Sequence, residues 1–278
     1  MTRRRWMVLA LACAALPACG DGTGPRPSLQ GQWVYRVRLD QIRGNPSARC
    51  SVSGVVRFQQ SGASVSGKMQ DPAIVCVNLG VGVDDSDFDS TTTVFGSVQG
   101  DSVLLTMQGP GLAVTQSVRV LGDSLAGRLL DSGGGVVAGR RYPDSEPLGR
   151  TTVHVSGAVT QTQALYARFS GPILFMVPRF GIHGLMLRPY DLNAKLSTGT
   201  FTVGGTGSAY NGYYAGPIVG GHFEPFVDFT SGSMTITYAD HQIARGSIDV
   251  QGPVSSTGAA ARVQADFVAI VDRHPVEF

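Results

Sequence analysis

Residues 92–108 read TTVFGSVQGDSVLLTMQ, and this stretch decides the fold class. Apolar and polar side chains alternate on both sides of Gly100-Asp101, which is typical of strands that bury one face. A Gly-Asp pair supplies the positive φ angle that a two-residue hairpin turn requires. The stretch therefore predicts a β-hairpin.

The same pattern continues in both directions along the chain. Ser61-Gly62 and Gly122-Asp123 also separate alternating segments and predict two further tight turns. No window has the 3.6-residue period of an amphipathic helix. The sequence therefore predicts an all-β protein, with strands at 32–39, 49–59, 64–69, 73–79, 92–99, 102–108, 113–120, 124–130, 136–141, 151–161, 164–169, 173–177, 185–187, 200–203, 233–238, 243–251 and 260–271.

One segment interrupts the alternation. Residues 142–150 (YPDSEPLGR) contain two prolines and several charges, which is typical of a linker. The segments on either side, 29–141 and 151–278, are each long enough to form a hydrophobic core. We predict two antiparallel domains, the first a meander barrel or a sandwich and the second a β-sandwich.

The first 28 residues have the features of an export signal. Residues 3–5 are arginines, and residues 6–16 form an apolar run too short to span a bilayer. Leu16-Pro17-Ala18-Cys19 resembles the lipobox of bacterial lipoproteins, which is cleaved before the cysteine. The resemblance implies that residues 1–18 are a signal peptide and that acylated Cys19 attaches the chain to a lipid bilayer. An ordinary secretory signal, with Cys19 uninvolved, is the alternative.

The residues after Cys19 indicate where the chain would reside. Residues 19–28 are polar and rich in Gly and Pro, as in a flexible tether. Gly20 stands where some lipoproteins of the inner membrane carry Asp. We therefore expect an exported protein that is lipid-anchored in the cell envelope, most simply at the outer membrane.

The charge of the chain argues against nucleic-acid binding. Charged residues are 15% of the sequence, and the formal net charge is +2. Removing residues 1–18 removes three arginines and no acids, so the net charge becomes 2 − 3 = −1. Nucleic-acid binding relies on a basic surface, which a near-neutral chain does not supply.

Cysteine usage fits an oxidising compartment. Of the four cysteines, Cys13 would leave with the signal peptide and Cys19 would carry lipid. Cys50 and Cys76 remain, and we predict that they form a disulfide. The 26-residue separation corresponds to about 3–4 kcal/mol of stabilisation if the bond acts on the entropy of the unfolded chain.

Two short motifs in residues 29–141 resemble the lipocalins and the wider calycin group. Gly31-Gln32-Trp33 opens the first predicted strand, and Arg140 and Arg141 close the last one. In calycins a Gly-x-Trp on the first strand packs under a late arginine, which suits a cation–π contact. The resemblance implies a barrel whose mouth holds a small apolar ligand. A barrel filled by its own side chains and a plain sandwich are the alternatives.

An acidic loop is the candidate metal site. Asp85, Asp87 and Asp89 alternate along the chain, so their carboxylates can point to one calcium ion. The loop lacks the glycine and the distal glutamate of an EF-hand, and a solvated turn is the simpler interpretation. Calcium is the one cofactor that we consider, and the remaining histidines and acids match no zinc spacing.

Aromatic side chains interleave with glycines between residues 204 and 229. Tyr210, Tyr213, Tyr214 and Phe223 are candidates for stacking on a flat ligand such as a sugar ring. The simpler alternative is that these rings close the core beneath a long loop. The surrounding sequence is too irregular to predict strands throughout.

Catalysis has little support in the sequence. The chain contains no Gly-x-Ser-x-Gly or Ser-x-x-Lys motif, and we expect no free cysteine in the mature protein. We therefore expect an envelope lipoprotein that acts as a non-catalytic binding module for a small ligand or an envelope component. A structural or assembly protein that binds other proteins through its β-faces is the alternative, ahead of a hydrolase whose active site forms only in the fold.

Overall fold

The computed structural model describes residues 27–41, 45–78, 92–109, 112–131, 133–178 and 183–272. The predicted signal peptide, Cys19, most of the predicted tether and the predicted calcium ligands Asp85, Asp87 and Asp89 lie outside these ranges. Within them every regular element is a β-strand, which confirms the all-β prediction. Nowhere in the described ranges is there a helix with the length and hydropathy to cross a membrane.

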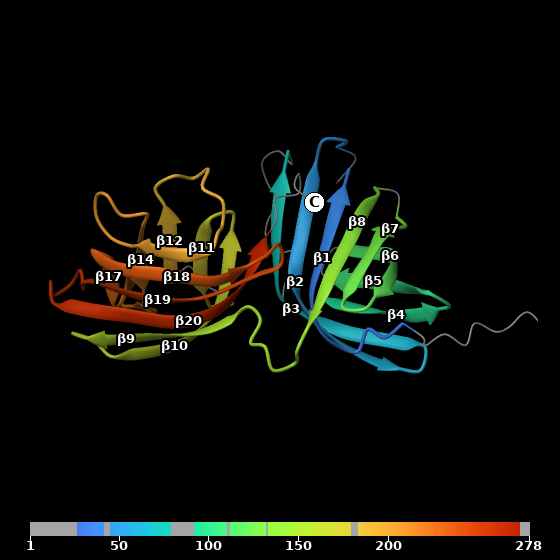
Figure 1. Ribbon diagram of the computed structural model, residues 1–278, viewed down its shortest axis with the longest axis horizontal. Helices are drawn as coiled ribbons and strands as arrows, with labels where there is room; N and C mark the ends of the chain where they lie inside the picture. The colour runs from blue at the N-terminus through green and yellow to red at the C-terminus, as the bar shows by residue number, and fades with distance from the viewer. Residues whose placement is uncertain are drawn as a thin grey trace, which may run out of the picture.

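The first half is a closed antiparallel barrel in which each strand pairs with the next and β8 returns to β1 (Figure 1). A barrel of this kind is the architecture that the calycin resemblance implies, and it decides against the sandwich alternative. Its strands are β1 (Gly31–Asp40), β2 (Arg49–Ser61), β3 (Ser64–Val77), β4 (Thr93–Gln99), β5 (Ser102–Gly109), β6 (Leu112–Leu121), β7 (Ser124–Leu129) and β8 (Gly135–Tyr142).

The tight turns lie where the sequence predicts them. Gly62, Gly100 and Gly122 have φ angles of 60°, 59° and 60°, which glycine adopts without steric cost. The strands predicted at 64–69 and 73–79 are one strand, β3. Its pairing with β2 shifts register between Ser53 and Val55, and this bulge lets the strand continue past the break in alternation.

Side chains of the described strand residues occupy the barrel interior. Alternate residues of each strand point inward and are buried, the largest being Trp33, Tyr35, Phe58, Met69, Leu105 and Met107. Inward-facing glycines make room for them, because a Cβ at Gly54 would lie 2.8 Å from Met69 and one at Gly139 would lie 2.9 Å from Leu125. Large and small residues thus interdigitate, as in other small barrels.

The second half is one ten-stranded sheet that curls around a single core, so the two layers expected of a sandwich belong to one sheet. A bridge between Val227 of the last strand, β17, and Val254, directly after β19, links one end of the sheet to a strand near the other end. In order across the sheet the strands are β13 (Gly199–Thr202), β18 (Ser231–Ala239), β19 (Ile243–Pro253), β20 (Ala260–Asp272), β9 (Arg150–Gly157), β10 (Gln161–Ser170), β11 (Ile173–Val177), β12 (Gly184–Pro189), β14 (Tyr210–Ala215) and β17 (Phe226–Asp228); β15 (Ile218–Val219) and β16 (His222–Phe223) form a separate hairpin.

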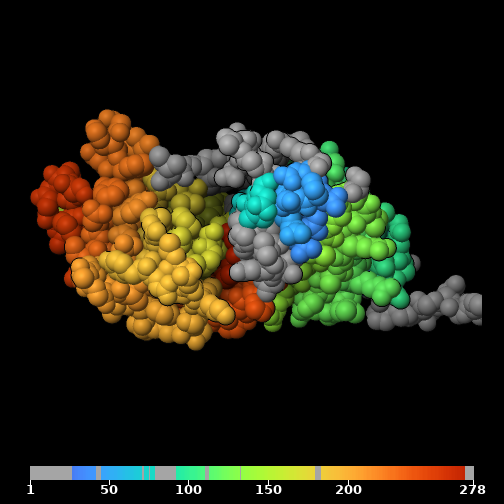
Figure 2. Space-filling model, turned by 90° about the horizontal axis from the view of Figure 1, so that it is seen from above, coloured from blue at the N-terminus to red at the C-terminus, as the bar shows by residue number. Residues whose placement is uncertain are grey.

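Apolar side chains join the two halves, which lie side by side in Figures 1 and 2. Strands β1 and β2 are buried on both faces, because their outward side chains lie under the second sheet. Val34 and Val55 of the barrel pack with Ile243, Val268 and Ile270 in one cluster. This contact explains why burial does not alternate along most of these two strands, although polar and apolar residues alternate in their sequences.

Polar side chains add directed contacts across the same interface. Arg36 of β1 is 1% exposed, and its guanidinium donates hydrogen bonds to the carbonyls of His241, at 2.6 Å, and Val271. Ser53 of β2 donates to Asp272 at 2.5 Å, and Asp272 also pairs with Arg168. Buried charges are stable only where such partners are present, so these contacts fix one orientation of the two halves.

Candidate functional site

The motif behind the calycin resemblance forms the expected contact. The guanidinium carbon of Arg141 lies 4.8 Å from the centre of the Trp33 ring, as a cation–π pair requires. Trp33 donates its indole hydrogen to the carbonyl of Leu29 at 2.7 Å, and Arg141 donates to the carbonyl of Ser28. These bonds hold the entering chain across this end of the barrel.

The barrel interior contains a buried polar pair. Tyr35 donates a hydrogen bond to the amide oxygen of Gln116, and both side chains are fully buried. Burial raises the pKa of the Tyr35 hydroxyl far above its usual value, so the phenol is neutral at physiological pH. The described side chains around the pair belong to one buried apolar cluster.

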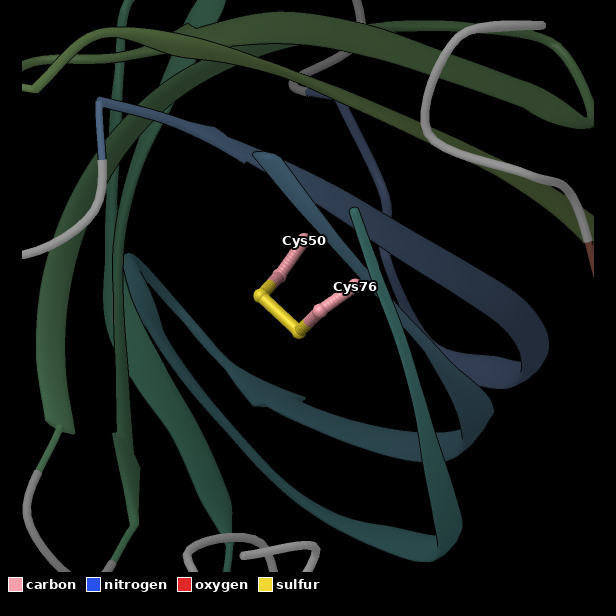
Figure 3. Close-up of a disulfide and its surroundings, with 2 residues drawn as sticks. All are labelled: Cys50 and Cys76. Carbon is pink, nitrogen blue, oxygen red and sulfur yellow. A yellow bond between two sulfur atoms is a disulfide. The ribbon is translucent and has the colours of Figure 1, made fainter. Parts of the chain in front are cut away.

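The predicted disulfide is present. Cys50 of β2 and Cys76 of β3 are directly opposite each other and are bonded (Figure 3). Both side chains belong to the barrel core, at the end opposite Trp33. The bond joins neighbouring strands beside residues 79–91, which lie outside the described ranges.

The predicted aromatic candidates divide into two groups. Tyr210 and Tyr214 point into the core of the second sheet, and burial raises the pKa of Tyr214 to about 12. Tyr213 is half-buried and stacks on Phe226, with ring centres 5.3 Å apart. Phe223 is also half-buried, in the β15–β16 hairpin. Of the four, only Tyr213 and Phe223 have surface left for a ligand.

Phe223 lines a small depression beside the hairpin. Its volume is about 480 Å³, and Phe226, His222, Glu224 and two serines complete its walls. His222 and Glu224 are exposed, and in the described part of the chain no group of three or more metal-ligating side chains exists. The depression is smaller than the groove on the second sheet, and its polar groups are those of His222, Glu224 and the two serines.

A larger groove, which sequence analysis does not predict, lies on the outer face of the second sheet. Its volume is about 900 Å³, within the range of ligand-binding clefts. A row of short side chains forms its floor, because Ser247, Asp266, Thr152 and Ala164 lie side by side on β19, β20, β9 and β10. These strands are at the lower left of Figure 1.

Longer side chains in the adjoining rows form the walls of the groove. On one side, Asp249, Gln264 and His154 are paired across the same strands. On the other side are Arg150, Tyr166 and, from the segment between the two halves, Pro147.

The barrel helps to hold the second wall in place. Arg150 donates a hydrogen bond to the Gln70 side chain of β3 at 3.1 Å. Leu148, in the segment between the two halves, packs into the interface cluster. One wall of the groove is therefore in contact with the barrel, whereas the floor belongs to the second sheet alone.

The two carboxylates of the groove have different partners. Arg262 binds both oxygens of Asp249 and lowers its pKa below the usual value, and Gln264 donates to the same group at 3.2 Å. Asp266 is exposed, and its carboxylate has no hydrogen-bond or ion-pair partner among the described residues. Asp266 is therefore the acceptor that is available to a ligand.

The histidines of the described ranges do not form a catalytic triad. His154 is exposed, and its Nδ1 lies 3.2 Å from the Thr162 hydroxyl. His222 and His241 are also exposed, and no described histidine is hydrogen-bonded to both a serine and an aspartate.

The chain matches no known protein-family model, and none of the curated proteins matches it either. The functional interpretation therefore depends on the geometry described above.

Proposed function

We propose that this protein is a lipid-anchored cell-envelope protein that binds a small polar ligand non-covalently in the groove of its second sheet. The groove itself carries the proposal. It combines a volume of about 900 Å³ with several hydrogen-bonding side chains and a free carboxylate, Asp266, on a rigid surface. The barrel supports one wall of this site.

The envelope location has two sources of support. The lipobox-like segment that ends at Cys19 would anchor the chain, with residues 19–28 as the tether. The Cys50–Cys76 disulfide fits an oxidising compartment, where structural disulfides persist.

Assembly through apolar faces is the less supported alternative. The large apolar side chains that are exposed in the described ranges are distributed over both halves, and only Ile218 and Val219 share a strand, β15. These exposed side chains are Phe95, Leu121, Leu130, Tyr190, Leu192, Ile218 and Val219. Protein-binding surfaces usually contain a contiguous apolar patch.

Native mass spectrometry tests the proposed function. The full chain, purified in detergent from an envelope preparation, should carry an adduct that disappears on denaturation. The Ala164→Arg variant should lose the adduct, because the arginine side chain fills the floor of the groove. The matched Ala126→Arg variant, on the exposed outer face of the barrel, should retain it. An adduct that survives Ala164→Arg, or the absence of an adduct together with no binding in the calorimetry described below, would contradict the proposal.

A further inference from the structure

We infer that the ligand of this groove is an uncharged saccharide, an inference that rests on the proposed function and specifies its ligand class. Three neighbouring positions of the groove floor carry polar groups: the hydroxyls of Ser247 and Thr152 and, between them, the carboxylate of Asp266. Neighbouring strands are about 4.8 Å apart, so the three groups form a short, regular row.

The row suits a ligand with several hydroxyl groups. Serine and threonine hydroxyls both donate and accept hydrogen bonds, whereas the Asp266 carboxylate only accepts them. A sugar ring presents hydroxyls that donate and accept in the same way along one edge. The ligand hydroxyls would donate to Asp266, and such charge-assisted hydrogen bonds are among the stronger ones.

The remaining walls supply the other contacts that a sugar needs. Tyr166 and Pro147 line one side of the groove, and Ala164 leaves open floor beside them. A sugar ring has an apolar face of C–H groups, which packs on aromatic and proline surfaces. Gln264 and His154 on the opposite wall offer further polar groups.

Other ligand classes fit the groove less well. An anion could reach the guanidinium of Arg150 in one wall, but it would meet the Asp266 carboxylate on the floor. The nearby guanidinium of Arg262 is already bound to Asp249. An apolar ligand would leave the floor carboxylate and hydroxyls without water or partners, which is costly. An extended peptide would add to a free strand edge, whereas β19, β20, β9 and β10 are all paired on both sides.

Isothermal titration calorimetry on the full chain in detergent tests the inference, with maltotetraose, cellotetraose and chitotetraose as the probes. At least one of the three should bind with a Kd of about 1 mM or tighter. Asp266→Asn should weaken binding by about tenfold, because the carboxylate acceptor is lost while the side-chain size is kept. Asp101→Asn, in an exposed barrel turn, should bind as the unmodified protein does.

The outcomes separate the ligand class from the proposed function. If none of the three saccharides binds at about 10 mM but the envelope adduct is lost in Ala164→Arg, the saccharide inference is wrong and the groove remains a binding site. If both saccharide binding and the adduct are absent, both proposals are wrong. If saccharides bind to Ala164→Arg and to Asp266→Asn as tightly as they bind to the unmodified protein, the groove is not the saccharide site. Circular dichroism on each variant checks that it is folded.

Discussion

At the scale of single residues, the polar pair inside the barrel leaves one buried donor without a partner among the described residues. Tyr35 satisfies the oxygen of Gln116, but the amide nitrogen of Gln116 has no hydrogen-bond partner among the described residues. A buried donor without a partner costs about 1–3 kcal/mol. The barrel therefore tolerates a polar pair that an apolar pair of similar size could replace.

A double-mutant cycle tests this interpretation. Tyr35→Phe should lower the free energy of unfolding by about 1–3 kcal/mol, because it leaves the whole Gln116 amide unsatisfied. Adding Gln116→Met should recover most of the loss, because no buried polar group then remains. Urea unfolding followed by Trp33 fluorescence measures both values. Losses that simply add in the double variant would show that the two side chains are not coupled.

Some residue contacts could be predicted from the sequence and others could not. The Trp33–Arg141 contact could, because both residues belong to short motifs at the two ends of the barrel sequence. Gln116 could have been assigned to the interior, since it alternates in step with Val114 and Val118. Asp266 could not be singled out, because its neighbours Ser247 and Thr152 are distant in sequence.

At the scale of elements, alternation and turn chemistry predict most of the barrel. Strands β4 to β7 lie within two residues of their predicted ends, because each is bounded by a turn or a short loop. The strand predicted at 151–161 is too long, because β9 ends at Gly157 and the chain turns back into its antiparallel neighbour β10, which begins at Gln161 and contains the strand predicted at 164–169. Gly157 has a φ angle of 100°, which ends the strand. The prediction missed this end because polar and apolar residues continue to alternate through Gly157.

The β2–β3 pair carries the second prediction. Replacing Cys50 and Cys76 together by alanine should lower the free energy of unfolding by about 3–4 kcal/mol, because the unfolded chain regains the entropy of a 26-residue loop. Urea denaturation of the oxidised protein and of the double variant measures the difference. The unmodified protein in reductant is the control and should match the double variant. A loss below about 1 kcal/mol would mean that the bond hardly restricts the unfolded chain.

At the scale of the whole molecule, the docking of the two halves could not be predicted. The polar residues that form it, Arg36, Ser53 and Asp272, are far apart in sequence and have no motif. The groove could not be predicted from the sequence either, because its floor takes one residue from each of four strands whose order the sequence does not encode locally. Residues 143–149 connect β8 of the barrel to β9 of the second sheet.

The interface predicts how the protein unfolds. The unmodified protein should unfold in one calorimetric transition, because Arg36 and the surrounding apolar cluster link the two cores. Arg36→Met leaves three carbonyls of the second half without its hydrogen bonds, and should lower stability by about 2–4 kcal/mol and split the transition in two. Differential scanning calorimetry measures both effects. Arg119→Met, on the exposed barrel face, is the control, and a single unchanged transition in Arg36→Met would refute the coupling.

The position of β20 has a consequence for synthesis. The barrel strands pair in chain order, so the barrel can close before the rest of the chain is made. The second sheet cannot, because β20, the last described strand, lies between β19 and β9 in its middle. A ribosome that stops before residue 260 would release a finished barrel joined to strands with two bare edges. Bare edges pair with other chains, so such a fragment would aggregate or be degraded rather than persist as a partly active protein.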